Sequence, residues 1–191
     1  MSLRRSAVWS LVVALLVLTG CSGLQGTEGK QYVAGDGQIV TFDPEDRGAP
    51  VEARGESVAG GPLDLADYRG RVVIANVWWS GCGPCRKEMP LLADVAEDLR
   101  DDAVLLGINV REVGVDNSRS FLRDVGVDFP SFYDPGSEVL LRLSDKLGPY
   151  SLPSTVVLDR RGRLAVLVLG EIPGSVTMRN AIDDVAAETD G

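Results

Sequence analysis

The sequence predicts an α/β fold in which helices flank a central mixed β-sheet, with a short N-terminal hairpin before it. Two continuous apolar runs rich in β-branched residues, 71–79 and 103–110, are typical of strands buried on both faces of a sheet. Between them, residues 84–100 place apolar side chains at helical spacing, with most of the charged side chains on the opposite side. This alternation of buried strands with an amphipathic helix favours a sheet covered by helices.

Turn signals and periodicity define the remaining elements in chain order. Residues 52–68 are expected to form the hairpin that precedes the first buried strand. A short helix that ends at a glycine is predicted at 117–126, and a further helical segment at 136–144. Two strands joined by a turn are expected within 154–170, followed by a closing amphipathic helix at 174–188.

Residues 1–20 have the pattern of an export signal. Arg4 and Arg5 precede an apolar run of about a dozen residues, shorter than the roughly 20 that span a bilayer as a helix. The run ends in LTGC (18–21), which resembles the bacterial lipobox. We therefore expect Cys21 to carry a lipid anchor, since two or more acyl chains hold a protein stably at a membrane. An ordinary secretory peptide with a chance cysteine is the alternative.

The rest of the chain divides into a tether and one domain. Residues 21–40 are polar and rich in glycine at their start, as in a flexible spacer, and residues 41–191 have the length of a single domain. We expect the domain to lie on the extracytoplasmic side of a bacterial cell membrane, anchored through Cys21. The pattern does not distinguish general secretory from twin-arginine export.

Composition excludes several classes of function. The formal charge of −9 disfavours nucleic acid as a partner. The chain has no histidine, which excludes Cys-His and Ser-His-Asp catalysis, histidine metal sites and a haem-attachment motif within the protein. We expect no cofactor and no metal ion, so the chemistry depends on cysteine, carboxylate, lysine or tyrosine side chains.

Cys82 and Cys85 lie where a buried strand gives way to a helix. At a helix N-terminus, unpaired backbone N–H groups and the helix dipole stabilise an anion, so Cys82 is expected to be a thiolate nucleophile. Cys85, one turn later, can attack the mixed disulfide that Cys82 forms. A structural disulfide here would close such a short loop that it would stabilise the fold by only about 2 kcal/mol. A closed zinc site would need two more ligands. The spacing favours a redox pair over both.

The motifs NVWWSGCGPCRKEMP (76–90) and YSLPSTVVLDRRGRL (150–164) resemble the thioredoxin fold, and within it the membrane-tethered thiol-disulfide oxidoreductases of the TlpA/ResA type. The resemblance covers roughly residues 50–187. It implies that Pro153 is a cis-proline facing the cysteines, which would present the backbone of Leu152 to a bound chain.

Further substrate contacts are expected near Cys82, from Trp79, Gly83 and Pro84. Two positions differ from thioredoxin itself. Asn76 replaces its buried aspartate, and Gly81 replaces the tryptophan before its first cysteine.

Glu88 is the predicted proton partner of the cysteines, because Asn76 cannot carry a proton. Counting 100° per residue from Cys85 places Glu88 on the apolar side of the helix with Leu92 and Val95. A carboxyl group in those surroundings should have a raised pKa. The TlpA/ResA resemblance also implies a glutamate at this position of the active site. A surface glutamate on the shoulder of the helix is the alternative.

These expectations lead to one main function and two alternatives. The resemblance implies reduction of protein disulfides, with the paired cysteines of apocytochrome c as substrate and electrons supplied by a membrane thiol transporter. A thiol oxidase that forms disulfides in exported proteins would use the same residues at a higher reduction potential. A non-catalytic binding lipoprotein would leave Cys82 and Cys85 inert. We expect a monomer whose partners are protein thiols and disulfides.

Overall fold

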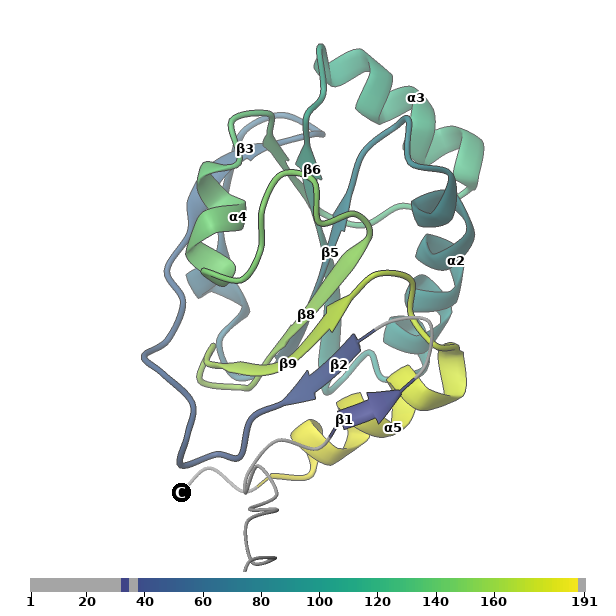
Figure 1. The fold of residues 1–191 in the computed structure, drawn as a ribbon. Coiled ribbons are helices and arrows are strands. Elements are labelled where there is room, and N and C mark those ends of the chain that lie inside the picture. The colour runs from purple at the N-terminus through teal and green to yellow at the C-terminus, as the bar shows by residue number, and fades with distance from the viewer. Residues whose placement is uncertain (1–31, 35–37, 189–191) are drawn as a thin grey trace, which may run out of the picture.

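The computed structural model describes residues 32–34 and 38–188, and the strands of this part form one nine-stranded sheet (Figure 1). Its strand order is β1-β2-β9-β8-β5-β6-β7-β3-β4. The strands are β1 (Tyr32–Ala34), β2 (Gln38–Thr41), β3 (Arg54–Ser57), β4 (Pro62–Asp64), β5 (Val72–Trp78), β6 (Ala103–Val110), β7 (Ser131–Asp134), β8 (Ser154–Leu158) and β9 (Leu164–Leu169). The helices are the 3-10 helix η1 (Leu65–Tyr68) and the α-helices α2 (Gly83–Asp98), α3 (Val115–Val125), α4 (Glu138–Leu143) and α5 (Ser175–Ala186).

The sheet is mixed, as predicted. Strands β5, β6 and β7 are parallel neighbours, whereas β8 pairs antiparallel with β5, in register from Val73↔Leu158 to Val77↔Ser154. All seven residues of β5 are buried, which confirms the expectation of a strand covered on both faces. The loops that follow β5 and β6 and the loop that precedes β8 therefore meet at one end of the sheet.

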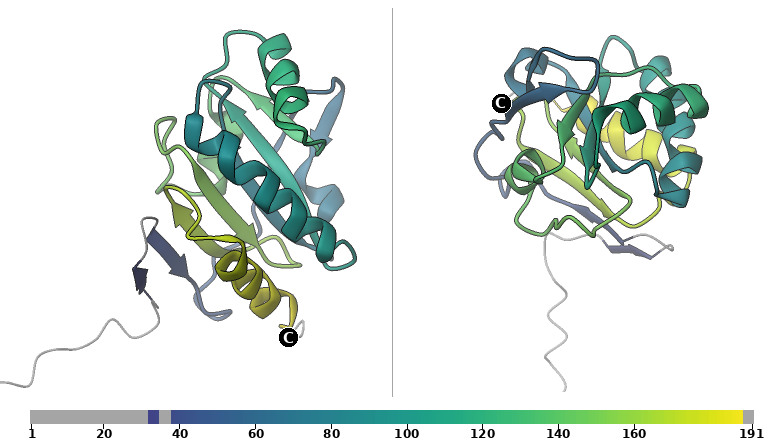
Figure 2. Two further views of the ribbon diagram at one scale, coloured as in Figure 1. Left: turned by 90° about the vertical axis from the view of Figure 1, so that its right-hand side faces the viewer. Right: turned by 90° about the horizontal axis from the view of Figure 1, so that it is seen from above.

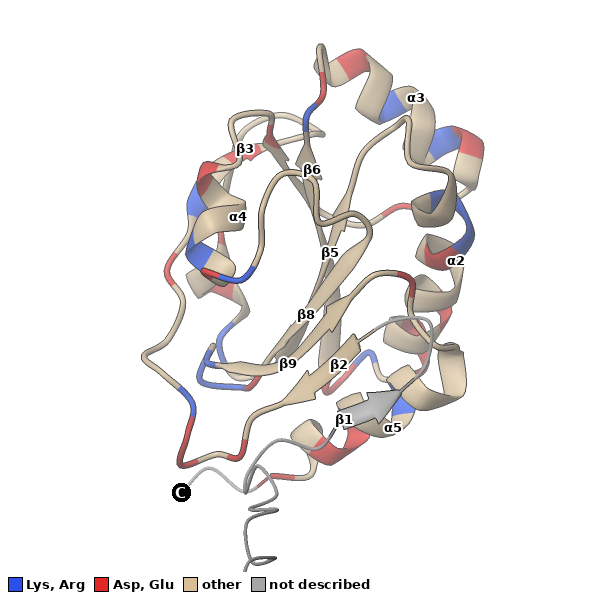
Figure 3. Ribbon diagram, viewed as in Figure 1, with Lys and Arg blue, Asp and Glu red and all other residues tan. Residues whose placement is uncertain are grey.

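Helices cover both faces of the sheet. Figure 2 shows α2, α3 and α5 on one face, where side chains of α2 and α5 pack against the sheet in a single apolar cluster. Side chains of α4 pack into the cluster on the other face. Figure 3 shows charged residues mainly on helices and loops, with few on the central strands. No helix in the described ranges combines the length and apolar composition needed to cross a membrane.

The structure extends the predicted element list at two places. The N-terminal hairpin is confirmed as β3 paired with β4, whereas the short strand β7 was not predicted. The domain was predicted to start at residue 41, whereas two strands begin before that point: β1, which pairs with β2, and β2, which begins at Gln38 and pairs with β9. Ile39 and Val40 are buried against the sheet, so the folded part begins inside the range assigned to the tether.

Candidate active site

Cys82 and Cys85 form a disulfide at the N-terminus of α2, immediately beyond the end of β5. Cys82 is the N-cap residue, and the two Cα atoms are 5.3 Å apart. The exposed fraction is 8% for Cys82 and 0% for Cys85. The strand-to-helix junction predicted from the sequence therefore leaves Cys82 slightly exposed and Cys85 fully buried.

Backbone groups around the disulfide favour negative charge on Cys82. The Cys85 N–H donates a hydrogen bond to Cys82 Sγ at 3.2 Å, and Pro84, which has no N–H to leave unpaired, occupies the first turn of the helix. These groups and the dipole of a 16-residue helix should stabilise a thiolate at Cys82. Cys85 Sγ instead lies 4.0 Å from the carbonyl oxygen of Val77, which favours its neutral form.

The loop before β8 lies beside the disulfide. The Leu152–Pro153 peptide bond is cis, as expected from the resemblance, and Pro153 is buried. The Leu152 side chain packs against the apolar cluster that contains both cysteines. The backbone N–H of Leu152 donates a hydrogen bond to the carbonyl oxygen of Tyr150 at 2.9 Å. In this conformation the backbone of a bound chain can therefore form a hydrogen bond only with the Leu152 carbonyl.

Glu88 is buried on the inner face of α2, with an exposed fraction of 3%. Its Oε1 accepts a hydrogen bond from Asn76 Nδ2 at 2.7 Å, and its Oε2 accepts one from the Ile172 N–H at 3.1 Å. Burial raises the pKa of Glu88 from 4.5 to about 7, although both hydrogen bonds oppose the shift, and the nearby Glu171 adds to it. The carboxyl group can therefore gain or lose a proton near neutral pH.

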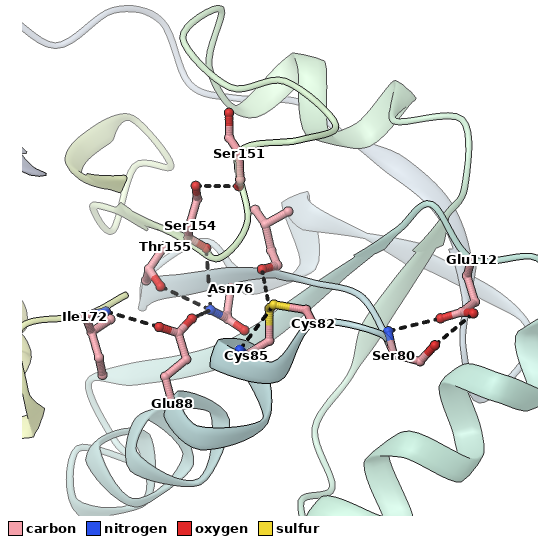
Figure 4. Close-up of a disulfide and its surroundings, with 11 residues drawn as sticks. Asn76, Ser80, Cys82, Cys85, Glu88, Glu112, Ser151, Ser154, Thr155 and Ile172 are labelled. Carbon is pink, nitrogen blue, oxygen red and sulfur yellow. Dashed lines mark hydrogen bonds between the residues drawn. A yellow bond between two sulfur atoms is a disulfide. The ribbon is translucent and has the colours of Figure 1, made fainter. Parts of the chain in front are cut away.

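Asn76 connects the carboxyl group to β8. Its Nδ2 is also 3.2 Å from Thr155 Oγ1 and 3.4 Å from the carbonyl oxygen of Ser154, while its buried Oδ1 has no hydrogen-bond partner within the described residues. In the view of Figure 4 the Asn76 side chain lies between Glu88 and the disulfide. The position that holds an acid in thioredoxin therefore supplies an amide that positions an acid from the neighbouring helix.

Comparison with known proteins identifies the family. Residues 47–167, more than half of the chain, match the AhpC/TSA family. The chain belongs to the AhpC/TSA family. It is 30% identical to the thiol-disulfide oxidoreductase ResA of Bacillus subtilis over 124 residues, which is 63% of this chain and 65% of that relative, just under two thirds of its length.

Solved structures of relatives confirm the thioredoxin-like fold of this family member. A DsbF homologue from Corynebacterium diphtheriae is 30% identical, with a TM-score of 0.71 over 85% of this chain and 97% of its own. A secreted thiol-disulfide isomerase from Corynebacterium glutamicum is 31% identical, with a TM-score of 0.74 over 84% of this chain and 100% of its own. The resemblance to the TlpA/ResA type is likewise confirmed by the ResA relative.

The structure brings most of the predicted site residues of this AhpC/TSA-family chain to one end of the sheet. Gly83 is exposed and Pro84 half-buried at the start of α2, and Trp79 packs against the cluster that contains the cysteines. Glu88 differs from expectation in one respect, because its oxygens bond to Asn76 and Ile172 and to neither sulfur. Cys21 lies outside the described residues.

The sequence analysis missed a second buried carboxylate, Glu112, which holds the loop before Cys82. Its Oε2 accepts a hydrogen bond from the Ser80 N–H at 3.2 Å, and its Oε1 accepts one from Ser80 Oγ at 3.0 Å (Figure 4). Asn117 Nδ2 lies 3.4 Å from the same Oε1. Its position in the sequence could have indicated this role. Glu112 follows the end of β6, and the cysteines follow the end of the neighbouring parallel strand β5, so both lie at the same end of the sheet.

Gly81 fits beneath the ring of Trp79, which accounts for the absence of a larger residue before Cys82. A Cβ at position 81 would lie 2.4–2.7 Å from three ring carbons of Trp79. We expect Gly81→Ala to displace the ring and lower the free energy of unfolding by about 1 kcal/mol in urea denaturation.

The control for this change is Gly83→Ala, because a Cβ at Gly83 would meet no atom within 4 Å. It should leave the free energy of unfolding unchanged or slightly raised, since alanine is the better helix former. Equal losses in Gly81→Ala and Gly83→Ala would contradict the role of the ring contact.

No metal site accompanies these residues in the part of the chain that the structure describes. Its Cys, Asp and Glu side chains form no group of three that could hold a metal ion. The arrangement offers thiol and carboxyl chemistry, in which two sulfurs can exchange electrons and Glu88 can exchange a proton.

Proposed function

We propose that this protein is a thiol-disulfide oxidoreductase of the bacterial cell envelope that reduces protein disulfides through Cys82 and Cys85. One observation carries the proposal: a disulfide at a helix N-terminus with Cys82 near the surface and Cys85 fully buried, next to the cis-proline loop. The names of the relatives, an oxidoreductase and an isomerase of thiols and disulfides, support the same chemistry.

The proposed reaction transfers two electrons in two exchanges. The Cys82 thiolate attacks one sulfur of the substrate disulfide, which forms a Cys82–substrate disulfide and releases the other substrate sulfur as a thiolate. The Cys85 thiolate then attacks the Cys82 sulfur. This step forms the Cys82–Cys85 disulfide and releases the second substrate thiolate, so the substrate is reduced and the enzyme oxidised. A membrane thiol transporter then restores the dithiol.

Glu88 serves in this proposal as the group that takes the proton from the buried Cys85 thiol. A pKa of about 7 lets the carboxylate accept that proton near neutral pH. Asn76 can stabilise both protonation states of Glu88. Its Nδ2 donates to the carboxylate, and a half-turn of the amide would turn its Oδ1, which is unpaired among the described residues, towards the protonated group. Because Glu88 bonds to neither sulfur, the proton would pass through a water molecule or a side-chain movement.

The remaining parts of the proposal concern location and partners. A lipid on Cys21 would hold the domain on the extracytoplasmic side of the membrane, as a monomer. The paired cysteines of apocytochrome c are the proposed substrate. Trp79, Gly83, Pro84 and the Leu152 carbonyl would contact the chain that carries them.

A second candidate function is formation or isomerisation of disulfides in exported proteins. It is favoured by the Corynebacterium glutamicum relative, which is described as a secreted thiol-disulfide isomerase. The same two sulfurs would serve, and the difference would lie in the reduction potential of the pair.

The reduction potential of Cys82–Cys85 is the measurement that tests the proposal. The purified protein is equilibrated in glutathione buffers, and its free thiols are alkylated and counted by mass spectrometry. A potential near about −270 mV, together with reduction of insulin, is expected of a reductase, whereas a value near about −120 mV would favour the oxidase. If the Cys82–Cys85 pair exchanged with no protein disulfide, the non-catalytic binding lipoprotein would be the remaining alternative.

A further inference from the structure

Three side chains from three loops stack next to the disulfide. The guanidinium of Arg111 lies 4.6 Å from the centroid of the Trp79 ring and 4.7 Å from that of the Tyr150 ring. Trp79 follows β5, Arg111 follows β6, and Tyr150 belongs to the loop before β8. The cation is thus in contact with two aromatic rings, an arrangement that holds its otherwise mobile side chain in place.

This stack lies beside the cluster that contains the two cysteines. The Trp79 ring lies against Gly81, the residue before Cys82, and packs against that cluster. Tyr150 precedes Leu152 by two residues, and its backbone carbonyl oxygen accepts a hydrogen bond from the Leu152 N–H. A chain bound across Cys82 and the Leu152 carbonyl would therefore pass beside Arg111.

Arg111 has donors available for such a chain. Its side chain is exposed, and within the described residues its guanidinium makes neither an ion pair nor a hydrogen bond. The acid next to it, Glu112, is buried and accepts hydrogen bonds from Ser80 and Asn117. The rings of Trp79 and Tyr150 contact the guanidinium as a cation and take up none of its N–H groups in a conventional hydrogen bond, so these groups can donate to a ligand.

The backbone of Arg111 is held in an uncommon conformation. Its φ is 60°, in the left-handed region that residues other than glycine and asparagine seldom adopt. Such a conformation is strained and persists where the surrounding structure over-determines it, most often at functional sites. The strained backbone of Arg111, in a loop next to the disulfide, therefore indicates that its side chain has a functional role.

We propose that Trp79, Arg111 and Tyr150 form a recognition site, here called the arginine clamp, for substrate chains that carry an acidic side chain next to the reactive cysteine. The proposal rests on the proposed function and specifies its substrate class. The planar fork of a guanidinium matches the two oxygens of a carboxylate, and the exposed Tyr150 ring offers apolar contact to the rest of the chain. The formal charge of −9 repels acidic chains at long range, so the preference depends on this short-range contact.

The test compares symmetric disulfide dimers of one short peptide, blocked at both ends, with Glu, Gln or Lys next to its cysteine. Blocking leaves the side chain as the only carboxylate. The reduced protein is mixed with each dimer, and the second-order rate constant is followed by release of peptide thiol. We expect the Glu dimer to react about threefold to tenfold faster than the Gln dimer, and the Lys dimer to react more slowly still.

Variants separate the clamp from general charge effects. Arg111→Gln should lower the ratio of Glu to Gln rates to one or below, since only the repulsion by the negative protein then remains. Tyr150→Ala should lower the ratio while the cation remains. Arg142→Gln on α4 removes another exposed cation, away from the disulfide, and should keep the wild-type ratio. Arg111→Gly accepts a positive φ without strain, so it must lose the preference too if the side chain is responsible.

The outcomes distinguish the two proposals. Equal rates of wild-type protein with the Glu and Gln dimers would overturn the arginine clamp and leave the oxidoreductase intact. A preference for Glu that survives in both Arg111→Gln and Arg111→Gly would also overturn it. If the wild-type protein reduced none of the three dimers, the proposed function itself would fail.

Discussion

Replacing Cys82 with serine should lower the rate of protein disulfide reduction by at least about a thousandfold, whereas replacing Cys85 should arrest the reaction at a covalent adduct with the substrate. The reason is the unequal placement of the two sulfurs. Cys82 is the one near the surface, and the Cys85 N–H and the α2 N-terminus stabilise its thiolate. Cys85 is fully buried, so it can reach the Cys82 sulfur but not an incoming chain.

Non-reducing mass spectrometry after mixing with a protein disulfide measures this difference. Cys85→Ser should accumulate a species with the mass of protein plus substrate, which disappears on addition of dithiothreitol. Cys82→Ser should accumulate none, and a variant with both cysteines replaced controls for non-covalent association. An adduct formed through Cys85 in Cys82→Ser would reverse the assignment of nucleophile and resolving cysteine.

The centre of the fold was predictable because its strands and helix are long enough to show a clear hydrophobic pattern. The largely apolar strands β5 and β6, with a helix between them whose apolar residues recur at regular spacing, require a covered sheet whatever the detailed contacts. The cysteine pair was predictable for the same reason, because its position depends only on where β5 ends and α2 begins. The solved structures of relatives confirm the fold.

Short elements were missed because tertiary pairing, not periodicity, decides them. Strand β7 has four residues after a proline, and it forms where β6 offers a parallel partner. Strand β2 also has four residues, and its Ile39 and Val40 are buried only because β9 lies beside them. Neither run is long enough to show a period that distinguishes strand from loop.

The surroundings of the cysteines were predictable only where helical phase determines them. Phase placed Glu88 on the inner face of α2, but its partner Ile172 comes from a loop 84 residues later. Glu112, which fixes Ser80, and Arg111, which stacks on Trp79, come from the end of β6. Such contacts depend on which loops meet at the end of the sheet. The spacing of residues within one segment of the sequence does not indicate which loops these are.

Raising the pH from 4.5 to 8 should lower the stability of the oxidised protein relative to its Glu88→Gln variant by about 3 kcal/mol. In the folded protein the pKa of Glu88 is raised from 4.5 to about 7. Below pH 4.5 the group is neutral in the folded and unfolded states alike. Between the two pKa values the unfolded chain loses the proton first, so rising pH favours unfolding, and above pH 7 the full cost of the buried charge is present.

Urea denaturation of both proteins at several pH values measures this difference. Glutamine stays neutral, so the free energy of unfolding of wild type minus that of Glu88→Gln should fall through this pH range and level off above it. Other buried carboxyl groups titrate in both proteins and cancel. The control Glu97→Gln removes an exposed carboxylate from the same helix and should retain the wild-type pH dependence.

A difference between wild type and Glu88→Gln that stays constant from pH 4.5 to 8 would mean that Glu88 has the same pKa, near 4.5, in the folded and unfolded protein. The proton-transfer role would then fail, because a carboxylate that does not bind a proton near neutral pH cannot accept one from Cys85. If the difference falls as expected, Glu88→Gln should also change the pH dependence of Cys85 alkylation in the reduced protein. A stability effect without that change would make Glu88 a buried carboxyl group held by Asn76 and Ile172, with no part in the exchange.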